Sequence, residues 1–308
     1  MIFKRKNYDG KNAKIKGLSI SVEELLKQQN YLPYLKMPNA KITSSLSGEV
    51  KSAFKGRGME LEEVRAYAYG DDIRDMDWRV TARKSEPFTK VYSQEKDREV
   101  TVLIDMSATM VFGTRNELKT VSAAKIAALL GWYALQNKDR FGALIFDGKT
   151  TQYFKPQNNR QNLTAIFKAL EKTSEDVLKN SKKGDISSAL KTLQIHQKGQ
   201  GIIFILSDFS SFNKQKFEQI AALSKHNRLY CLNIFDVLEE VAPPSDEYTA
   251  EYEQQKVQFD SSSESYKRAY QQYFAGKREL LRNNCRKFSV QYSEIRTDLP
   301  LFKQLRII

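Results

Sequence analysis

Side chains that carry oxygen follow two of the most apolar stretches of the chain. Asp105, Ser107 and Thr109 stand at alternate positions from the end of the run VTVLID, and Asp208 directly follows the run GIIFILS. Carboxylates and hydroxyls are the ligands that Mg²⁺ and Ca²⁺ prefer, and a loop that presents them at alternate positions can wrap a hard cation. The spacing therefore predicts a cation-binding loop after the first of these runs.

Both apolar runs have the pattern of central strands that are covered on both faces. In an open α/β sheet, ligands gather beyond the carboxyl ends of the strands, where strand order reverses. Neighbouring strands lie about 4.8 Å apart, so Asp105 and Asp208 would crowd one edge if their strands were adjacent. Two crowded carboxylates require a cation, a water molecule or a basic group between them.

The remaining residues of chemical interest carry weaker patterns. His196 and His226 stand at the expected ends of helices without metal-ligand spacing, so we expect neither a histidine-based zinc site nor a histidine-activated nucleophile. Cys231 and Cys285 form no CxxC pair, which is typical of reduced thiols in a cytosolic protein.

Hydrophobic periodicity predicts an alternation of buried strands and amphipathic helices from Val100 onward. Asp147-Gly148 predicts a hairpin. The stretch 237–260 interrupts the alternation and is expected to be an excursion between a strand and a helix. The class is therefore α/β, with a mainly parallel sheet and one antiparallel hairpin strand. We expect strands at 100–105, 201–207, 229–235 and 288–294, a hairpin at 140–155, and helices at 117–136, 159–172, 186–195, 213–226 and 262–284.

The chain of 308 residues has a formal net charge of +13, and this charge is concentrated at its N-terminal end. Residues 1–58 contain twelve basic and four acidic residues, with one short helix expected at 21–29 and irregular structure at 30–57. Such a basic leader is attracted to anionic surfaces. Without an apolar signal region or a membrane-length run, we expect a cytoplasmic protein, with peripheral contact at the inner membrane face left open and nucleic acid less favoured.

The stretch VTVLIDMSATM resembles the first strand and the metal-ion-dependent adhesion loop (DxSxS) of von Willebrand factor A domains, with Thr109 in place of the last Ser. This resemblance implies a Rossmann-like sheet of six mainly parallel strands flanked by helices, in the order 3-2-1-4-5-6. It also implies that Asp105 and Asp208 are neighbours. The implied ligands of Mg²⁺ or Ca²⁺ are Asp105, Ser107, Thr109 and Asp208, with Asp185 as a further candidate.

One element departs from that family. Where these domains usually have Gly-Gly-Thr-Asp, this chain has Lys182-Lys183-Gly184-Asp185, so that Gly184 stands at the position of a metal-site threonine. A ligand is missing there, and Lys183 adds positive charge. The alternative to a bound metal is a degenerate site whose carboxylates bond to backbone, water or lysine.

Residues 56–98 resemble the signature of the family called domain of unknown function 58, in which a Gly-Asp-Asp-x-Arg-x-x-Asp-Trp segment precedes a von Willebrand A-like domain. Its carboxylates and guanidiniums alternate, which suits ion pairs that hold a turn and a hairpin. Gly70 permits a positive φ, and Trp78 offers a large anchor. The block is therefore either a structural clasp or a partner-docking surface. Its elements are Arg65, Tyr67, Gly70, Asp71, Asp72, Arg74, Asp77, Trp78 and Arg83.

Together the two resemblances divide the chain into a leader (1–58), a charged β-hairpin block (59–98) and a von Willebrand A-like domain (99–308). They imply a non-enzymatic bacterial factor in which the A domain couples a MoxR-type AAA+ ATPase to an unidentified client in assembly, maturation or stress tolerance. One alternative is a Mg²⁺-dependent phosphoesterase or nuclease that uses Asp105, Asp208 and Asp185. The other is binding of nucleic acid or a membrane surface through the leader.

Overall fold

The structure is a computed structural model that describes residues 2–5, 17–35, 59–94, 98–197, 199–244, 247–252 and 255–304. It contains two units, one made of Met1–Pro38 with Arg98–Ile308 and the other of Asn39–Asp97. The lysines of the predicted leader between residues 6 and 16, and residues 36–57 of the predicted irregular segment 30–57, lie outside the described residues. Residues 30–34 of that segment belong to a 3-10 helix, η1 (Gln28–Tyr34).

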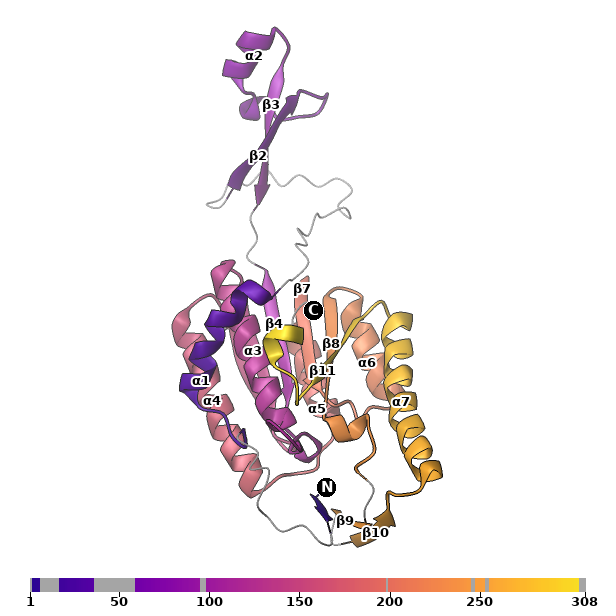
Figure 1. The fold of residues 1–308 in the computed structure, drawn as a ribbon. Helices are drawn as coiled ribbons and strands as arrows, with labels where there is room; N and C mark the ends of the chain where they lie inside the picture. Colours follow the sequence, from indigo (N-terminus) through magenta and orange to yellow (C-terminus); the bar gives the residue numbers. More distant parts are fainter. Residues whose placement is uncertain are drawn as a thin grey trace. The chain divides into compact units, whose positions relative to one another are not determined.

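A six-stranded sheet forms the centre of the larger unit (Figure 1). Its strand order is β11-β8-β7-β4-β5-β6, and only β6 is antiparallel to its neighbour. This is the order that the resemblance to von Willebrand A domains implies, so the predicted fold class is confirmed. The strands are β4 (Glu99–Asp105), β5 (Arg140–Phe146), β6 (Thr151–Gln157), β7 (Gly201–Ser207), β8 (Arg228–Phe235) and β11 (Gln291–Arg296).

Helices cover both faces of this sheet, which explains why the central strands are apolar at consecutive positions. Connections from one parallel strand to the next run through helices, as parallel pairing requires. One face carries α1 (Val22–Lys27), α3 (Lys119–Gln136) and α4 (Arg160–Lys179), and the other carries α5 (Ser187–His196), α6 (Lys214–Ser224) and α7 (Glu264–Lys287).

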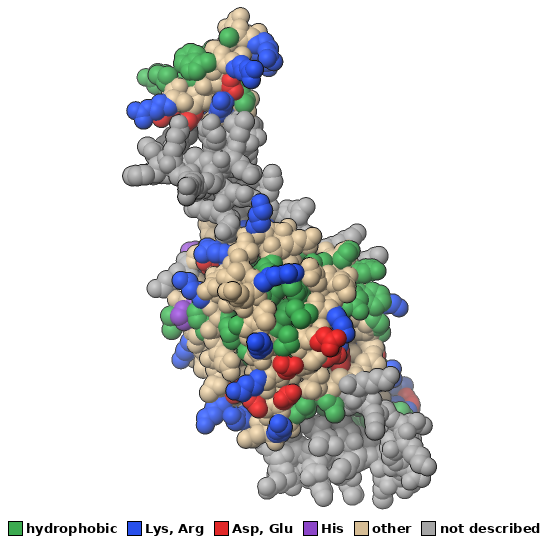
Figure 2. Space-filling view, turned by 90° about the vertical axis from the view of Figure 1, so that its left-hand side faces the viewer, with side chains coloured by type: hydrophobic (Ala, Val, Ile, Leu, Met, Phe, Trp, Pro, Cys, Tyr) green, Lys and Arg blue, Asp and Glu red, His purple; other side chains and the backbone are tan. Residues whose placement is uncertain are grey.

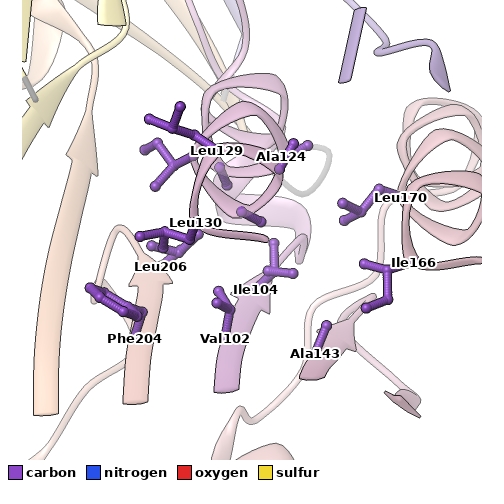
Figure 3. Close-up of a cluster of buried hydrophobic side chains, with 14 of the residues drawn as sticks. Val102, Ile104, Ala124, Leu129, Leu130, Ala143, Ile166, Leu170, Phe204 and Leu206 are labelled. Atoms are coloured by element: carbon purple, nitrogen blue, oxygen red, sulfur yellow. The ribbon is translucent and has the colours of Figure 1, made fainter. Parts of the chain in front are cut away.

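The larger hydrophobic cluster lies between the sheet and helices α3 and α4 (Figure 3). Val102 and Ile104 of β4 point toward α3, Leu130 of α3 lies beside Leu206 of β7, and Ile166 of α4 lies beside Ala143 of β5. These positions alternate with Leu103, which belongs to the cluster on the opposite face. Burial on both faces holds the carboxyl end of β4 in a fixed place.

The helix predicted in the leader belongs to the core of the larger unit. Ser21 and Glu24 form a capping box that starts α1. Ile20 and Leu25 are buried, and the indole of Trp132 in α3 donates a hydrogen bond to the carbonyl oxygen of Leu25. The predicted division separates residues 1–58 from the fold, but these apolar contacts bind residues 17–35 to the domain that follows.

A small antiparallel sheet in the larger unit has no counterpart among the predicted strands. It consists of β1 (Ile2–Arg5), β9 (Glu247–Tyr252) and β10 (Gln255–Asp260), in the order β1-β9-β10. The last two strands form a hairpin within the predicted excursion 237–260, between β8 and α7. Charged residues alternate there without an apolar run, so the sequence carries no clear strand signal.

The smaller unit is a hairpin whose connection contains two short helical segments. Strands β2 (Met59–Ala66) and β3 (Phe88–Gln94) pair antiparallel, and η2 (Ile73–Asp75) and α2 (Trp78–Lys84) lie in the connection between them. This confirms the predicted β-containing subdomain. Among the described residues of the whole chain, no helix has both the length and the apolar character that crossing a bilayer requires.

The core cluster predicts the effect of one truncation. Ile104→Ala should lower the free energy of unfolding by about 3 kcal/mol. The side chain of Ile104 is fully buried, so its truncation leaves a cavity that the neighbouring side chains do not fill. Ile195→Ala removes the same atoms from a side chain that is 63% exposed and should change stability by less than about 0.5 kcal/mol. Urea denaturation measures both, and equal losses would contradict this placement of the core.

Candidate functional site

Strands β4 and β7 are adjacent and parallel, with Ile104 opposite Leu206 in the register. Asp105 ends β4 and Asp208 directly follows β7, so the predicted proximity of the two carboxylates is confirmed. Asp105 is buried and accepts two hydrogen bonds, one from the backbone N–H of Ser107 (3.0 Å) and one from the hydroxyl of Ser207 (2.6 Å). These bonds fix the start of the loop that follows β4.

Three further oxygen-bearing side chains meet beside Asp105. The hydroxyl oxygens of Ser107 and Thr109 lie 3.5 Å apart, and Thr109 donates a hydrogen bond of 3.3 Å to Oδ1 of Asp208. The same Oδ1 accepts the backbone N–H of Ser210 at 3.0 Å. The sheet edge therefore brings together the four residues that the sequence nominates as ligands.

A buried lysine completes this cluster. Lys119, the first residue of α3, is 1% exposed, and its ammonium donates to Oδ2 of Asp208 (2.8 Å) and to both carboxylate oxygens of Glu239 (3.0 and 3.2 Å). Glu239 belongs to η4 (Val237–Glu239), which follows β8. The basic group that two crowded carboxylates require is thus present in the chain itself.

The charges of this cluster shift one another's titration. Burial acts to raise the pKa of Asp208, but the Lys119 ammonium outweighs it and holds that pKa below its ordinary value. Burial acts to lower the pKa of Lys119, and Asp208 and Glu239 together raise it instead. For Asp105, burial raises the pKa of the carboxyl, and the negative charge of Asp208 raises it further.

Glu239 is held in place by a capping box with the buried Asp236. Asp236 and Glu239 form a capping box around η4, in which Asp236 accepts the N–H of Leu238 and Glu239 accepts the N–H of Asp236. Asp236 also accepts hydrogen bonds from Thr114 and from Thr297. This network ties the loop before α3 to the ends of β8 and β11.

The structure places the fifth candidate ligand with other partners. The carboxylate of Asp185 accepts the N–H of Ser187 and pairs with Lys216 at 3.1 Å. Lys182 contributes its carbonyl oxygen, which accepts the N–H of Ala108 in the loop after β4. Gly184 lies against the hairpin glycine: a Cβ added to it would collide with the carbonyl oxygen of Gly148. Close approach of two backbones explains the glycine at the usual threonine position.

The donor set fits a hard cation in its chemistry. Ser107, Thr109 and Asp208 offer the hydroxyl and carboxylate oxygens that Mg²⁺ and Ca²⁺ take as ligands, and Asp105 stands behind them. Lys119 already supplies one positive charge to Asp208, so an added cation would meet a fixed like charge at that carboxylate. We expect this lysine to weaken the affinity of the site for a metal ion.

The carboxylates of the smaller unit form internal bonds. Asp71 pairs with Arg65 at 2.9 Å and accepts the N–H of Ala68, while Asp72 and Asp77 accept backbone N–H groups that begin η2 and α2. Gly70 has a φ of 102°, which confirms the positive value expected for this turn. These contacts are those of a clasp within the unit. Three other signature side chains, those of Arg74, Trp78 and Arg83, are exposed.

Sequence reasoning missed Lys119 and Glu239. Lys119 begins a largely apolar helix, and a lysine on the inward face of such a helix indicates a buried ion pair. For Glu239, the spacing Asp236-x-x-Glu239 signals a cap but not its partner, because Lys119 lies 120 residues away.

Comparisons with known proteins give a family and distant relatives. The model of a family described as "Protein of unknown function DUF58" matches residues 63–280. Uncharacterized protein Rv1480 of Mycobacterium tuberculosis and Uncharacterized protein Mb1516 of Mycobacterium bovis are each 30% identical over 169 residues, which cover 55% of this chain and 53% of each relative. The chain thus spans about half the length of the curated relatives it matches.

Solved structures give weaker matches. The conserved hypothetical protein BatB from Bacteroides thetaiotaomicron has a TM-score of 0.43 and 17% identity, over 68% of this chain and 95% of that one. An aerotolerance-related membrane protein from Bacteroides fragilis has a TM-score of 0.37 and 14% identity, over 68% of this chain and 100% of that one.

The ion pairs of Lys119 predict a large effect of one substitution. Lys119→Met should lower the free energy of unfolding at neutral pH by about 3–5 kcal/mol, because it leaves the buried Asp208 without its cation. Asp208 has a lowered pKa in the folded protein, so its stabilising effect is present above the unfolded pKa and lost as pH falls through the folded value. The difference between variant and wild type should therefore be fully present at neutral pH and shrink as pH falls below about 4.

Urea denaturation across this pH range measures that difference. Lys27→Met is the matched control, because it removes an ion pair with Glu23 that lies on the surface, and we expect little change. A deficit of the same size at every pH would contradict the assignment of Lys119 as the partner of buried carboxylates.

The contact between Gly184 and Gly148 predicts a second effect. Gly184→Ala should destabilise the protein by about 1–3 kcal/mol, because the added Cβ forces two backbone segments apart. Gly199→Ala is the control, since nothing lies within 4 Å of its added Cβ. Thermal unfolding followed by circular dichroism compares them, and equal melting temperatures would show that the two loops do not touch.

Proposed function

Because the chain belongs to the DUF58 family of proteins of unknown function, whose model matches most of its length, we propose a function from its site. The protein is a non-enzymatic interaction factor that binds a partner protein through the carboxyl edge of β4 and β7. The partner is a MoxR-type AAA+ ATPase, which the protein couples to a client. Mg²⁺ or Ca²⁺ at this edge would supply a Lewis-acidic point to which a carboxylate of the partner can bind.

A single observation carries this proposal: hydroxyl and carboxylate oxygens from two separate loops converge beside two adjacent strand ends. Ser107, Thr109 and Asp208 are linked by contacts of 3.5 and 3.3 Å. Thr109 is partly exposed, so a partner group can reach this end of the cluster. The carboxyl edge of an open α/β sheet is also where such folds take their ligands.

The residues of the sheet edge have different roles in binding. Asp105 orients the loop through the N–H of Ser107 and anchors it to β7 through the hydroxyl of Ser207. Lys119 is buried, so a partner cannot reach its ammonium, and its part is to neutralise Asp208 from within. Thr109, which is partly exposed, then takes the outward position, with the buried Ser107 beside it. We expect binding to depend on these hydroxyls more than on the overall charge of the chain.

The experiment measures binding of the purified full chain to the purified MoxR-type ATPase of the same organism by calorimetry, with Mg²⁺ and after chelation. Thr109→Val removes the hydroxyl while it keeps the shape of the side chain, and it should weaken binding by about tenfold or more. Asp105→Ala should do the same. Asp176→Ala on the exposed face of α4 is the control and should leave the affinity unchanged.

Four outcomes decide against parts of the proposal. Unchanged affinity in Thr109→Val and Asp105→Ala would remove the sheet edge as the binding surface. Unchanged affinity after chelation, with both variants still weak, would remove the cation and keep the edge. No binding of the wild type would remove the ATPase as partner, and metal-dependent release of phosphate from a generic phosphoester would favour an enzyme instead.

A further inference from the structure

The smaller unit carries a second surface that the sheet-edge function does not use. Tyr69, Ile73 and Trp78 are the large hydrophobic side chains exposed in this unit, with exposed fractions of 107%, 63% and 64% among its described residues. Figure 2 shows hydrophobic side chains gathered on this unit with Lys and Arg side chains on either side. Exposed apolar side chains that cluster in this way mark interaction sites.

Consecutive hydrogen-bonded turns hold these three side chains at one end of the hairpin. The N–H of Asp71 bonds to the carbonyl oxygen of Ala68, and Gly70 takes a positive φ between them. A second turn joins Asp75 to Asp72, and the side chain of Asp77 caps the first turn of α2. Backbone bonds thus fix the positions from which Tyr69, Ile73 and Trp78 project.

Two carboxylates and three guanidiniums of the same segment differ in their exposure. Asp71 and Asp77 point inward and accept backbone N–H groups. Their carboxylates are therefore bonded within the unit and do not face a partner. Arg74, Arg79 and Arg83 are exposed, and none of them forms an ion pair among the described side chains, 64–90, of this unit. Although residues 59–98 hold more acidic than basic residues, the end of the hairpin presents guanidiniums to its surroundings.

We propose that Tyr69, Ile73, Trp78 and the neighbouring arginines bind an acidic segment of a partner protein that also carries apolar side chains. Trp, Tyr and Arg are the residues that contribute most at protein–protein interfaces, and a guanidinium binds a carboxylate with two parallel hydrogen bonds. The inference is independent of the function proposed for the sheet edge. We name this group of residues the arginine-aromatic surface.

The composition of the surface favours this occupant over others. A second copy of the chain would bring its own arginines against these, and like charges oppose that pairing. A polyphosphate backbone would meet the exposed carboxylates of Asp72 and Glu86, whereas a short acidic segment can place its carboxylates on the arginines alone.

Selection from a phage-displayed library of random peptides on the immobilised full chain tests the proposal. Enriched peptides should combine Asp or Glu with Leu, Ile, Phe or Trp. The affinity of one enriched peptide, synthesised with a fluorescent label, is then measured by polarisation for the wild type and for the variants.

Two variants address the two halves of the surface. Trp78→Ser removes the anchor, and Arg79→Glu reverses one charge in the first turn of α2, where a carboxylate suits the helix dipole and preserves the fold. Each should weaken peptide binding by about tenfold or more. The controls are Ile195→Ser, which removes an apolar side chain of similar exposure, and Lys214→Glu in the first turn of α6, and neither should change the affinity.

Other results would overturn the proposal. Enrichment of basic peptides, or of none, would do so, as would equal affinity of Trp78→Ser and the wild type. Binding of a single-stranded DNA oligonucleotide or of phosphatidylserine vesicles, lost in the same two variants while acidic peptides do not bind, would assign the surface to those ligands. Dimerisation that is lost in Trp78→Ser would assign it to a second copy.

Discussion

The structure of the larger unit depends on one buried positive charge. The ammonium of Lys119 donates to Asp208 and Glu239, and so joins the start of α3 to the carboxyl ends of β7 and β8. None of these charges would be stable in the interior alone, because the free-energy cost of removing an ion from water exceeds the free energy gained from packing around it. Because the opposite charges neutralise one another, β7 and β8 can be followed by carboxylates at this edge of the sheet. Thr109 can then bond to Asp208, which brings the loop after β4 into its observed position.

This arrangement divides the site into an inner and an outer part. The inner part is the closed network of Lys119, Glu239 and Asp236, in which capping bonds and ion pairs hold three loops together. The outer part consists of the hydroxyls of Ser107 and Thr109 with one oxygen of Asp208. Asp105 is buried beside them, with its pKa raised by burial and then by the charge of Asp208. Stability thus comes from the inner network, and the partly exposed Thr109 is the member of the outer part that a partner can reach.

In the smaller unit too, internal bonds of carboxylates fix the backbone, but the side chains left exposed include arginines. Its signature carboxylates begin helical segments and pair with Arg65, which fixes the connection between β2 and β3. The remaining arginines then face outward beside exposed aromatic side chains. In three dimensions, the carboxylates of Asp71 and Asp77 turn inward to backbone N–H groups, whereas Arg74, Arg79 and Arg83 face outward. The protein therefore carries two surfaces of different chemistry, oxygen ligands on one unit and guanidiniums on the other.

The sequence by itself determined the features that local pattern encodes. The apolar runs that became β4 and β7, the hairpin at Asp147-Gly148 and the positive φ of Gly70 all follow from short-range periodicity or from turn chemistry. The family resemblance added the strand order. The tertiary structure decided which distant segments are in contact. It places Lys119 beside Glu239, Gly184 against Gly148, and α1 against Trp132. Such contacts depend on how whole layers pack, and packing against a segment that is distant along the chain leaves no periodic signal in either segment.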